Sequence, residues 1–274
     1  MRLLLAAVIA LLPVLTLPVG AEQRRPVIIT DGRSVPNPAP FVLVLHGFTS
    51  TGAALRRRTG FDALVHSHGF SVAYPTGPTR RWDDSSPTFT DMTYLTNLIL
   101  SQIALGRADP DHIYIAGHSN GGAMALRMSC AQPDLIRAIA AVAMNAQRKP
   151  QCPNGAPMPA LFIHGSGDPI IPPEGLPPSR NHGGFLSTSK TLEQWSRRNR
   201  CGPPAPIKRF NQTGGDTTAA FIRYTKCAAG LLHITLRGHG HEWPGAGRRA
   251  TWLQGPASRE LDAASAIWQF FAAN

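Results

Sequence analysis

The residues with the clearest chemical potential are Gly-His-Ser-Asn-Gly at positions 117–121. They follow an apolar run, 113–116, that is typical of a buried strand, and they precede an Ala- and Gly-rich segment that is typical of a helix. A serine on a sharp strand-to-helix turn holds its hydroxyl clear of the sheet, and flanking glycines are needed because a Cβ would clash there. The pattern predicts that Ser119 is a nucleophile. The simpler alternative is a turn whose serine only caps the next helix.

A nucleophilic serine needs a base to accept its proton and a carboxylate to orient that base. Asp168 directly follows the apolar run 160–164, so it is placed at the end of a predicted strand. A turn aspartate before proline is the alternative for this residue. We interpret Asp168 as the acid, because the chain order Ser, Asp, His is that of α/β-hydrolases.

The base is expected in the segment Gly-His-Gly-His-Glu-Trp-Pro at 238–244, after the apolar run 233–236. His241 is our choice, but spacing alone leaves His239 open, and Glu242 is a fallback for the acid. The same cluster also has residue types that bind metals. We give that alternative little weight because no further ligand cluster of matching spacing is found, and we expect neither a metal nor a cofactor.

Acyl transfer also needs donors aimed at the developing oxyanion. The backbone N–H groups of Phe48, after the strand end at 46–47, and of Asn120, after the serine, are placed for this role. Trp82 and Trp243 lie in predicted loops at the same end of the sheet. We predict that they form stacking walls for an aromatic or sugar group, with half-buried core as the alternative.

Strand and helix patterns alternate along the chain. Strands are predicted at 41–45, 71–74, 113–116, 138–144, 160–164 and 233–236, and helices at 53–67, 92–105, 122–128, 186–199 and 258–272. Continuous apolar strands that alternate with helices indicate an α/β fold with a mostly parallel central sheet and helices on both faces. In such sheets the ligand site lies at the carboxyl ends of the strands. The Pro- and Gly-rich segment 170–185 is predicted to be a loop that borders this site.

The N-terminal segment 1–21 has the pattern of a signal peptide. It carries one arginine near its start, then an apolar stretch, and it ends in Val-Gly-Ala. Two internal prolines, Pro13 and Pro18, disfavour the alternative of a retained helix. We expect a secreted protein with one catalytic domain, 22–274. No second apolar stretch is long enough for a membrane span.

The chain has 274 residues and a formal charge of +11. Its basic residues form short, scattered arginine clusters, at 56–58, 80–81, 197–198 and 248–249. A nucleic-acid-binding protein concentrates charge on one element, so we interpret the charge as a solvated surface, with weak attraction to anionic wall polymers as an additional effect.

Four cysteines in a secreted chain predict two disulfides, for which three connectivities exist. We choose the nearest-neighbour pairing, Cys130 with Cys152 and Cys201 with Cys227. Each bond closes a loop of moderate length and stabilises the fold by about 3 kcal/mol.

Several blocks of the sequence resemble the secreted esterases that include polyhydroxybutyrate depolymerases and feruloyl or acetylxylan esterases. The matching blocks are residues 45–48, 81–83, 113–125, 164–172, 195–201 and 238–245. The resemblance implies an α/β-hydrolase fold with Ser119 as nucleophile and Asp168 as acid. It also implies that His241 is the base, because this histidine directly precedes Glu-Trp-Pro-Gly.

The resemblance further implies a serine esterase that forms an acyl-enzyme on feruloyl or acetyl esters of plant polysaccharide, or on hydroxybutyrate oligomers. We expect a monomer. The strands before Phe41 are shortened to 27–30, and we find no appended binding module. These departures favour soluble or oligomeric esters over crystalline polymer. A non-catalytic wall- or polysaccharide-binding protein on the same scaffold is the alternative function, and a peptidase is a third.

Overall fold

The computed structural model describes residues 27–31, 37–85, 89–149, 152, 155–179, 183–211, 217–246 and 253–274. The predicted signal peptide, 1–21, lies outside these ranges. Within them, no helix has both the length and the apolar character that crossing a membrane requires.

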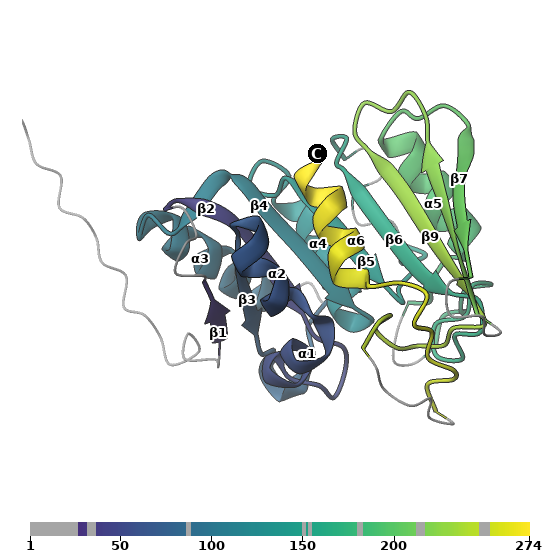
Figure 1. The fold of residues 1–274 in the computed structure, drawn as a ribbon, viewed down its shortest axis with the longest axis horizontal. Helices are drawn as coiled ribbons and strands as arrows, with labels where there is room; N and C mark the ends of the chain where they lie inside the picture. Colours follow the sequence, from purple (N-terminus) through teal and green to yellow (C-terminus); the bar gives the residue numbers. More distant parts are fainter. Residues whose placement is uncertain are drawn as a thin grey trace, which may run out of the picture.

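The described residues form one nine-stranded sheet with the order β1-β3-β2-β4-β5-β6-β9-β8-β7 (Figure 1). The strands are β1 (Val27–Thr30), β2 (Ala39–Leu45), β3 (Ser71–Pro75), β4 (Ala108–His118), β5 (Ala138–Val142), β6 (Ala160–Gly165), β7 (Pro204–Phe210), β8 (Thr218–Tyr224) and β9 (Leu231–Arg237). All neighbours from β3 to β9 are parallel, whereas β1 at one edge and β8 and β7 at the other are antiparallel. The predicted, mostly parallel sheet is confirmed.

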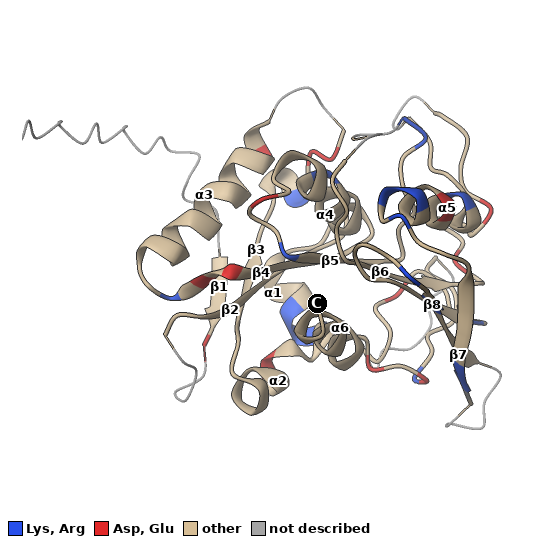
Figure 2. Ribbon diagram, turned by 90° about the horizontal axis from the view of Figure 1, so that it is seen from above, with Lys and Arg blue, Asp and Glu red and all other residues tan. Residues whose placement is uncertain are grey.

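Helices cover both faces of this sheet, as predicted. They are α1 (Gly52–Thr59), α2 (Phe61–His68), α3 (Thr90–Ala104), α4 (Asn120–Ala131), α5 (Thr188–Arg198) and α6 (Ala263–Ala272). Figure 2 shows the sheet edge-on, with α3, α4 and α5 on one face and α1, α2 and α6 on the other. Each face has its own apolar core, and successive residues of β2 alternate between them, with Leu43 in one core and Val44 in the other.

Three local features differ from the sequence prediction. The helix predicted at 53–67 is divided into α1 and α2 by Gly60, whose φ of 80° ends the first helix. The closing helix begins only at Ala263, where Asp262 caps it by accepting from the N–H of Ser265. Strands β7 and β8 were not predicted, because both are partly exposed antiparallel strands near the sheet edge and β7 contains two prolines.

Both predicted cysteine pairs are bonded in the structure. Cys130, at the end of α4, is bonded to Cys152. Cys201, after α5, is bonded to Cys227, after β8. Each bond therefore ties the end of a helix or strand to a neighbouring loop.

Candidate active site

The turn between β4 and α4 has the sharp geometry that its glycines predicted. Ser119 has φ 54° and ψ −123°, between the last residue of β4 and the first of α4. A Cβ on Gly117 would lie 2.1 Å from the carbonyl oxygen of Gly121, and one on Gly121 would lie 2.2 Å from the carbonyl oxygen of Leu45 in β2. Neither glycine can be replaced without moving backbone, so the serine is held in a fixed and strained conformation.

Three side chains from three strand ends form a continuous hydrogen-bonded chain. The Oγ of Ser119 lies 2.8 Å from Nε2 of His241, and Nδ1 of His241 lies 2.7 Å from Oδ2 of Asp168. The other carboxylate oxygen of Asp168 accepts from the backbone N–H groups of Ile170 and Ile171, both at 2.9 Å. The carboxylate is therefore fixed on both sides, and it orients an imidazole whose second nitrogen faces the serine hydroxyl.

His239 and Glu242 occupy different positions from this chain. The Nε2–H of His239 donates to the carbonyl oxygen of Glu242 at 2.9 Å, and its Nδ1 accepts from the N–H of Ser258 at 2.8 Å. The carboxylate of Glu242 forms an ion pair with Arg58. Both ring nitrogens of His239 therefore have structural partners. In the described part of the chain, no group of three or more His, Cys, Asp or Glu residues is arranged to hold a metal ion.

Two further buried histidines surround the site. Burial, with the nearby charges of His241 and Arg58, lowers the pKa of His118 well below its usual range. Burial also lowers the pKa of His164, which donates from Nε2 to the carbonyl oxygen of Ile171 at 2.7 Å. The same nitrogen lies 3.5 Å from Oδ2 of Asp168. Both imidazoles are neutral at pH 7, so they add no positive charge beside His241 and Asp168. The sequence analysis did not identify His164 as a neighbour of Asp168, although its position at the end of a predicted buried strand was visible.

The loops beside the serine are tied together by side chains. His46 accepts at Nε2 from the N–H of Gly77, at 3.0 Å, and its backbone oxygen accepts from the indole of Trp82, also at 3.0 Å. The amide of Asn120 forms a pair of hydrogen bonds with the backbone of Trp82, at 2.6 and 2.9 Å. These bonds fix the strand end before Phe48 and the first turn of α4. The oxyanion role of the Phe48 and Asn120 N–H groups stays a prediction.

The prediction that Trp82 and Trp243 form stacking walls requires correction. Their side chains are 0% and 1% exposed. The Trp82 indole is directed inward to His46, and Trp243 packs against Phe61 with ring centroids 6.2 Å apart. Both rings support the loops of the site from within, and neither is accessible to a ligand.

Ser119 and His241 instead line an open cleft of about 1000 Å³. Its exposed apolar side chains are Phe48, Ile170 and Leu253. Ile170 belongs to the predicted loop 170–185, which therefore borders the cleft as expected. This cleft can hold a substrate with an apolar part against the reacting serine.

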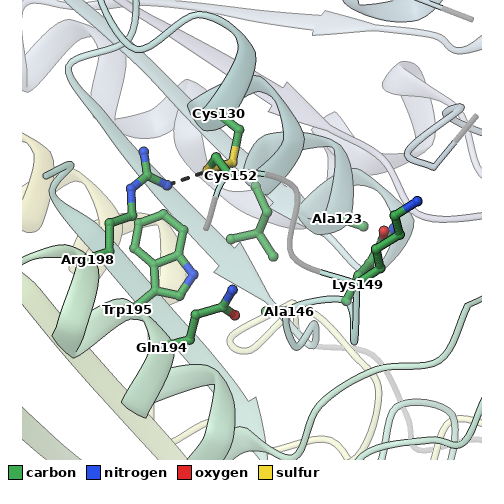
Figure 3. A pocket seen from close by; sticks show the side chains of 10 residues that line it. Ala123, Cys130, Ala146, Lys149, Cys152, Gln194, Trp195 and Arg198 are labelled. Atoms are coloured by element: carbon green, nitrogen blue, oxygen red, sulfur yellow. Dashed lines mark hydrogen bonds between the residues drawn. A yellow bond between two sulfur atoms is a disulfide. The ribbon is translucent and has the colours of Figure 1, made fainter. Parts of the chain in front are cut away.

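A second, smaller cavity of about 50 Å³ lies along α4, from Ala123 to Cys130 (Figure 3). The Cys130–Cys152 bond and three residues of α5, Gln194, Trp195 and Arg198, line it. The Arg198 guanidinium lies 4.5 Å from the centre of the Trp195 ring and donates to the carbonyl oxygen of Ser129 at 2.9 Å. Burial lowers the pKa of Arg198 to about 10, so it remains charged at pH 7. This cavity shares no residue with the cleft.

Comparison with known proteins places this fold among esterases. Residues 78–175 match the sequence model of the phospholipase/carboxylesterase family. NocK of Nocardia uniformis subsp. tsuyamanensis, whose name describes it as an esterase, is 30% identical over 242 residues, which cover 77% of this chain and 67% of NocK.

Two other proteins extend this similarity. The bifunctional acetylxylan esterase/xylanase XynS20E of Neocallimastix patriciarum is 23% identical over 225 residues, 78% of this chain and 30% of that protein. The structure of an acetyl xylan esterase from Aspergillus awamori superposes with a TM-score of 0.62 at 17% identity, covering 90% of this chain and 94% of that one. This chain, a carboxylic ester hydrolase, therefore belongs to the phospholipase/carboxylesterase family of α/β-hydrolases.

Proposed function

We propose that this protein is a secreted serine esterase that acts through a triad of Ser119, His241 and Asp168. The observation that carries the proposal is the hydrogen-bonded chain from the serine hydroxyl through the imidazole to the carboxylate, at 2.8 and 2.7 Å. A binding protein on the same scaffold has no need for all three groups in this order. No observation in the described residues favours that alternative.

In the proposed reaction, Ser119 Oγ attacks the ester carbonyl carbon while His241 accepts the hydroxyl proton. The resulting oxyanion accepts hydrogen bonds from the backbone N–H groups of Phe48 and Asn120. The imidazolium, stabilised by ionised Asp168, then gives its proton to the leaving alcohol. Water, activated by the same imidazole, hydrolyses the acyl-enzyme and restores the serine. One oxyanion donor contributes about 3 kcal/mol of transition-state stabilisation.

The proposed substrates are feruloyl or acetyl esters of plant polysaccharide, or hydroxybutyrate oligomers. The relatives support this class, because one of them is named as an acetylxylan esterase/xylanase and another as a poly(3-hydroxyalkanoate) depolymerase. A cleft of about 1000 Å³ with exposed apolar side chains has room for more than a small acyl group. Secretion is supported by the two disulfides and by the signal-peptide pattern of residues 1–21.

The first experiment is hydrolysis of p-nitrophenyl acetate by the purified protein and by Ser119→Ala. Loss of the nucleophile is expected to lower kcat by about 10⁶-fold. A panel of methyl ferulate, acetylated xylan and hydroxybutyrate oligomers then ranks the acyl groups. If the wild-type protein turns over no faster than Ser119→Ala on every member of the panel, the enzyme proposal is wrong.

A further inference from the structure

The cleft that holds Ser119 is lined by positive charge. Arg57, Arg58 and Arg80 line it together with Ser119 and His241. Among the described residues that line the cleft there is no aspartate or glutamate. A cleft that carries charge of one sign between low-dielectric walls focuses its potential and raises the local concentration of ligands of opposite charge.

One of the three arginines has a partner within the protein. Arg58 forms an ion pair with Glu242, whose side chain is only 1% exposed. Glu242 therefore compensates Arg58 from beneath the cleft, next to His241 in the chain. The pair explains why a charged residue can follow the base in sequence without acting as its orienting acid.

The other two arginines are exposed and come from different elements. Arg57 lies in the last turn of α1, and Arg80 ends the short turn η2 (Pro78–Arg80). Within the described part of the chain, neither guanidinium forms an ion pair with a carboxylate. Two positive charges at one cleft, from separate elements, remain available for a ligand.

The backbone that carries Arg80 is held in an unusual conformation. Thr79 and Arg80 have φ values of 50° and 60°, in the left-handed region that residues with a Cβ rarely adopt. The carbonyl oxygen of Arg80 accepts from the N–H of Thr49 at 2.8 Å. This bond ties the strained turn to the loop that carries Phe48. Strain of this kind persists where the surrounding structure fixes it, and it is concentrated at ligand sites.

We propose that Arg57 and Arg80 form an anion subsite, and that this esterase prefers esters that carry a carboxylate at a distance from the scissile bond. The proposal rests on the proposed function, since the subsite has meaning only beside a reacting serine. A guanidinium suits a carboxylate because its planar donors match the two oxygens. Two classes of proposed substrate can present this group: a hydroxyacid oligomer with a free carboxyl end, and an acetylated polysaccharide with uronate side groups.

The test uses a matched pair of aryl acetates, 4-acetoxybenzoate and its neutral carboxamide, 4-acetoxybenzamide. The measured quantity is the ratio of kcat/KM for the anionic ester to that for the neutral one, each corrected for its rate of hydrolysis by hydroxide. We expect a ratio of about ten for the wild-type protein, and a fall of about threefold in each of Arg57→Gln and Arg80→Gln. Raising NaCl to 0.5 M should lower the wild-type ratio, because exposed charges are screened.

The control variant is Arg107→Gln, which removes an equally exposed arginine that precedes β4, at the opposite end of that strand from Ser119. This variant should keep the wild-type ratio. A wild-type ratio of one, or ratios that do not change in Arg57→Gln and Arg80→Gln, would overturn the subsite. In that case the proposed function would still be supported if the wild-type protein cleaves the acetate ester of 4-acetoxybenzamide and Ser119→Ala does not. If neither ester is hydrolysed, both proposals fail.

Two further arms distinguish the source of the carboxylate. The first compares a 3-hydroxybutyrate trimer ending in a free carboxylate with the same trimer ending in a carboxamide. The second compares acetylated glucuronoxylan with its carboxyl-reduced form. If the wild-type protein prefers the charged member of either pair and Arg80→Gln loses that preference, the subsite is supported and that pair identifies its ligand. Equal rates within both pairs would overturn it.

Discussion

Helix α4 begins and ends in two different environments. Just before its first residue, the strained Ser119 faces an open cleft of about 1000 Å³ that is lined by arginines. At its last turn, Cys130 is bonded to Cys152 (Figure 3), and Arg198 donates to the carbonyl oxygen of Ser129. One end of the helix carries reacting groups with access to solvent, and the other is closed by a covalent bond and a half-buried cation.

The difference follows from the polarity of the helix. The first N–H groups of a helix have no partners within it and carry partial positive charge, so they suit an oxyanion. The last carbonyl groups carry partial negative charge and suit a cation such as Arg198. Substitutions at the cleft end should therefore change the rate of catalysis, and substitutions at the closed end should change the free energy of unfolding.

After loss of the nucleophile itself, the largest expected effect is at the cleft end, in Asp168→Asn. The variant keeps an oxygen that can accept from the Ile170 and Ile171 N–H groups, but it no longer stabilises the imidazolium or the correct tautomer of His241. We expect kcat for p-nitrophenyl acetate to fall by about 10⁴-fold at pH 7. The melting temperature should change by only a few degrees. An active variant would exclude Asp168 as the orienting acid, and an unfolded one would show that the two ends are not separable.

The second effect is at the closed end, in the double variant Cys130→Ser with Cys152→Ser. Loss of this bond is expected to lower the free energy of unfolding by about 3 kcal/mol, with kcat/KM within about twofold of wild type at 25 °C. Urea denaturation and ester hydrolysis measure the two quantities. The matched control removes Cys201 and Cys227, which follow α5 and β8, and should give a loss of similar size. A large fall in kcat/KM in the first variant alone would contradict the comparison.

The cleft end was the more predictable of the two from sequence. The turn around Ser119 is a local pattern of glycines between a strand and a helix, and Asp168 directly follows a buried strand. His241 needed the resemblance to known esterases, because spacing alone left His239 equally available. These residues are visible because each one is specified by its immediate neighbours in the chain.

The remaining features depend on contacts between distant segments. The ion pair between Arg58 and Glu242 joins residues 184 positions apart, so no pattern of neighbouring residues predicts it. The burial of Trp82 and Trp243 depends on how loops fold over the sheet, so a tryptophan in a loop was taken as accessible. The break at Gly60 was missed because the apolar pattern continues across it.

Acid should also lower the stability of the protein through a buried histidine of β9 that does not line the cleft. Burial, and the nearby charge of His164, lower the pKa of His233 in β9 from 6.5 to about 4. Between these two values the unfolded chain binds more protons than the folded one, so stability falls as pH falls. We expect the free energy of unfolding to drop by about 2 kcal/mol from pH 7 to pH 4.5 through this residue.

The variant His233→Gln removes the titrating group, and urea denaturation at the two pH values measures the change. Its stability should depend less on pH than that of the wild-type protein. His68→Gln is the control, because that imidazole is exposed on α2 and should leave the pH dependence unchanged. An identical slope in His233→Gln and wild type would show that acid acts elsewhere.

The smallest expected effect is that of Arg198, and it tests whether this charge and the Cys130–Cys152 bond stabilise the end of α4 independently. Arg198→Gln removes the cation that donates to Ser129 and packs over Trp195. We expect the free energy of unfolding to fall by about 1 kcal/mol, with little change in kcat/KM. In the background that lacks the Cys130–Cys152 bond, the same substitution should cost less, because the guanidinium then has a less ordered loop beside it. Equal costs in the two backgrounds would mean that the arginine and the disulfide close this end of the helix independently.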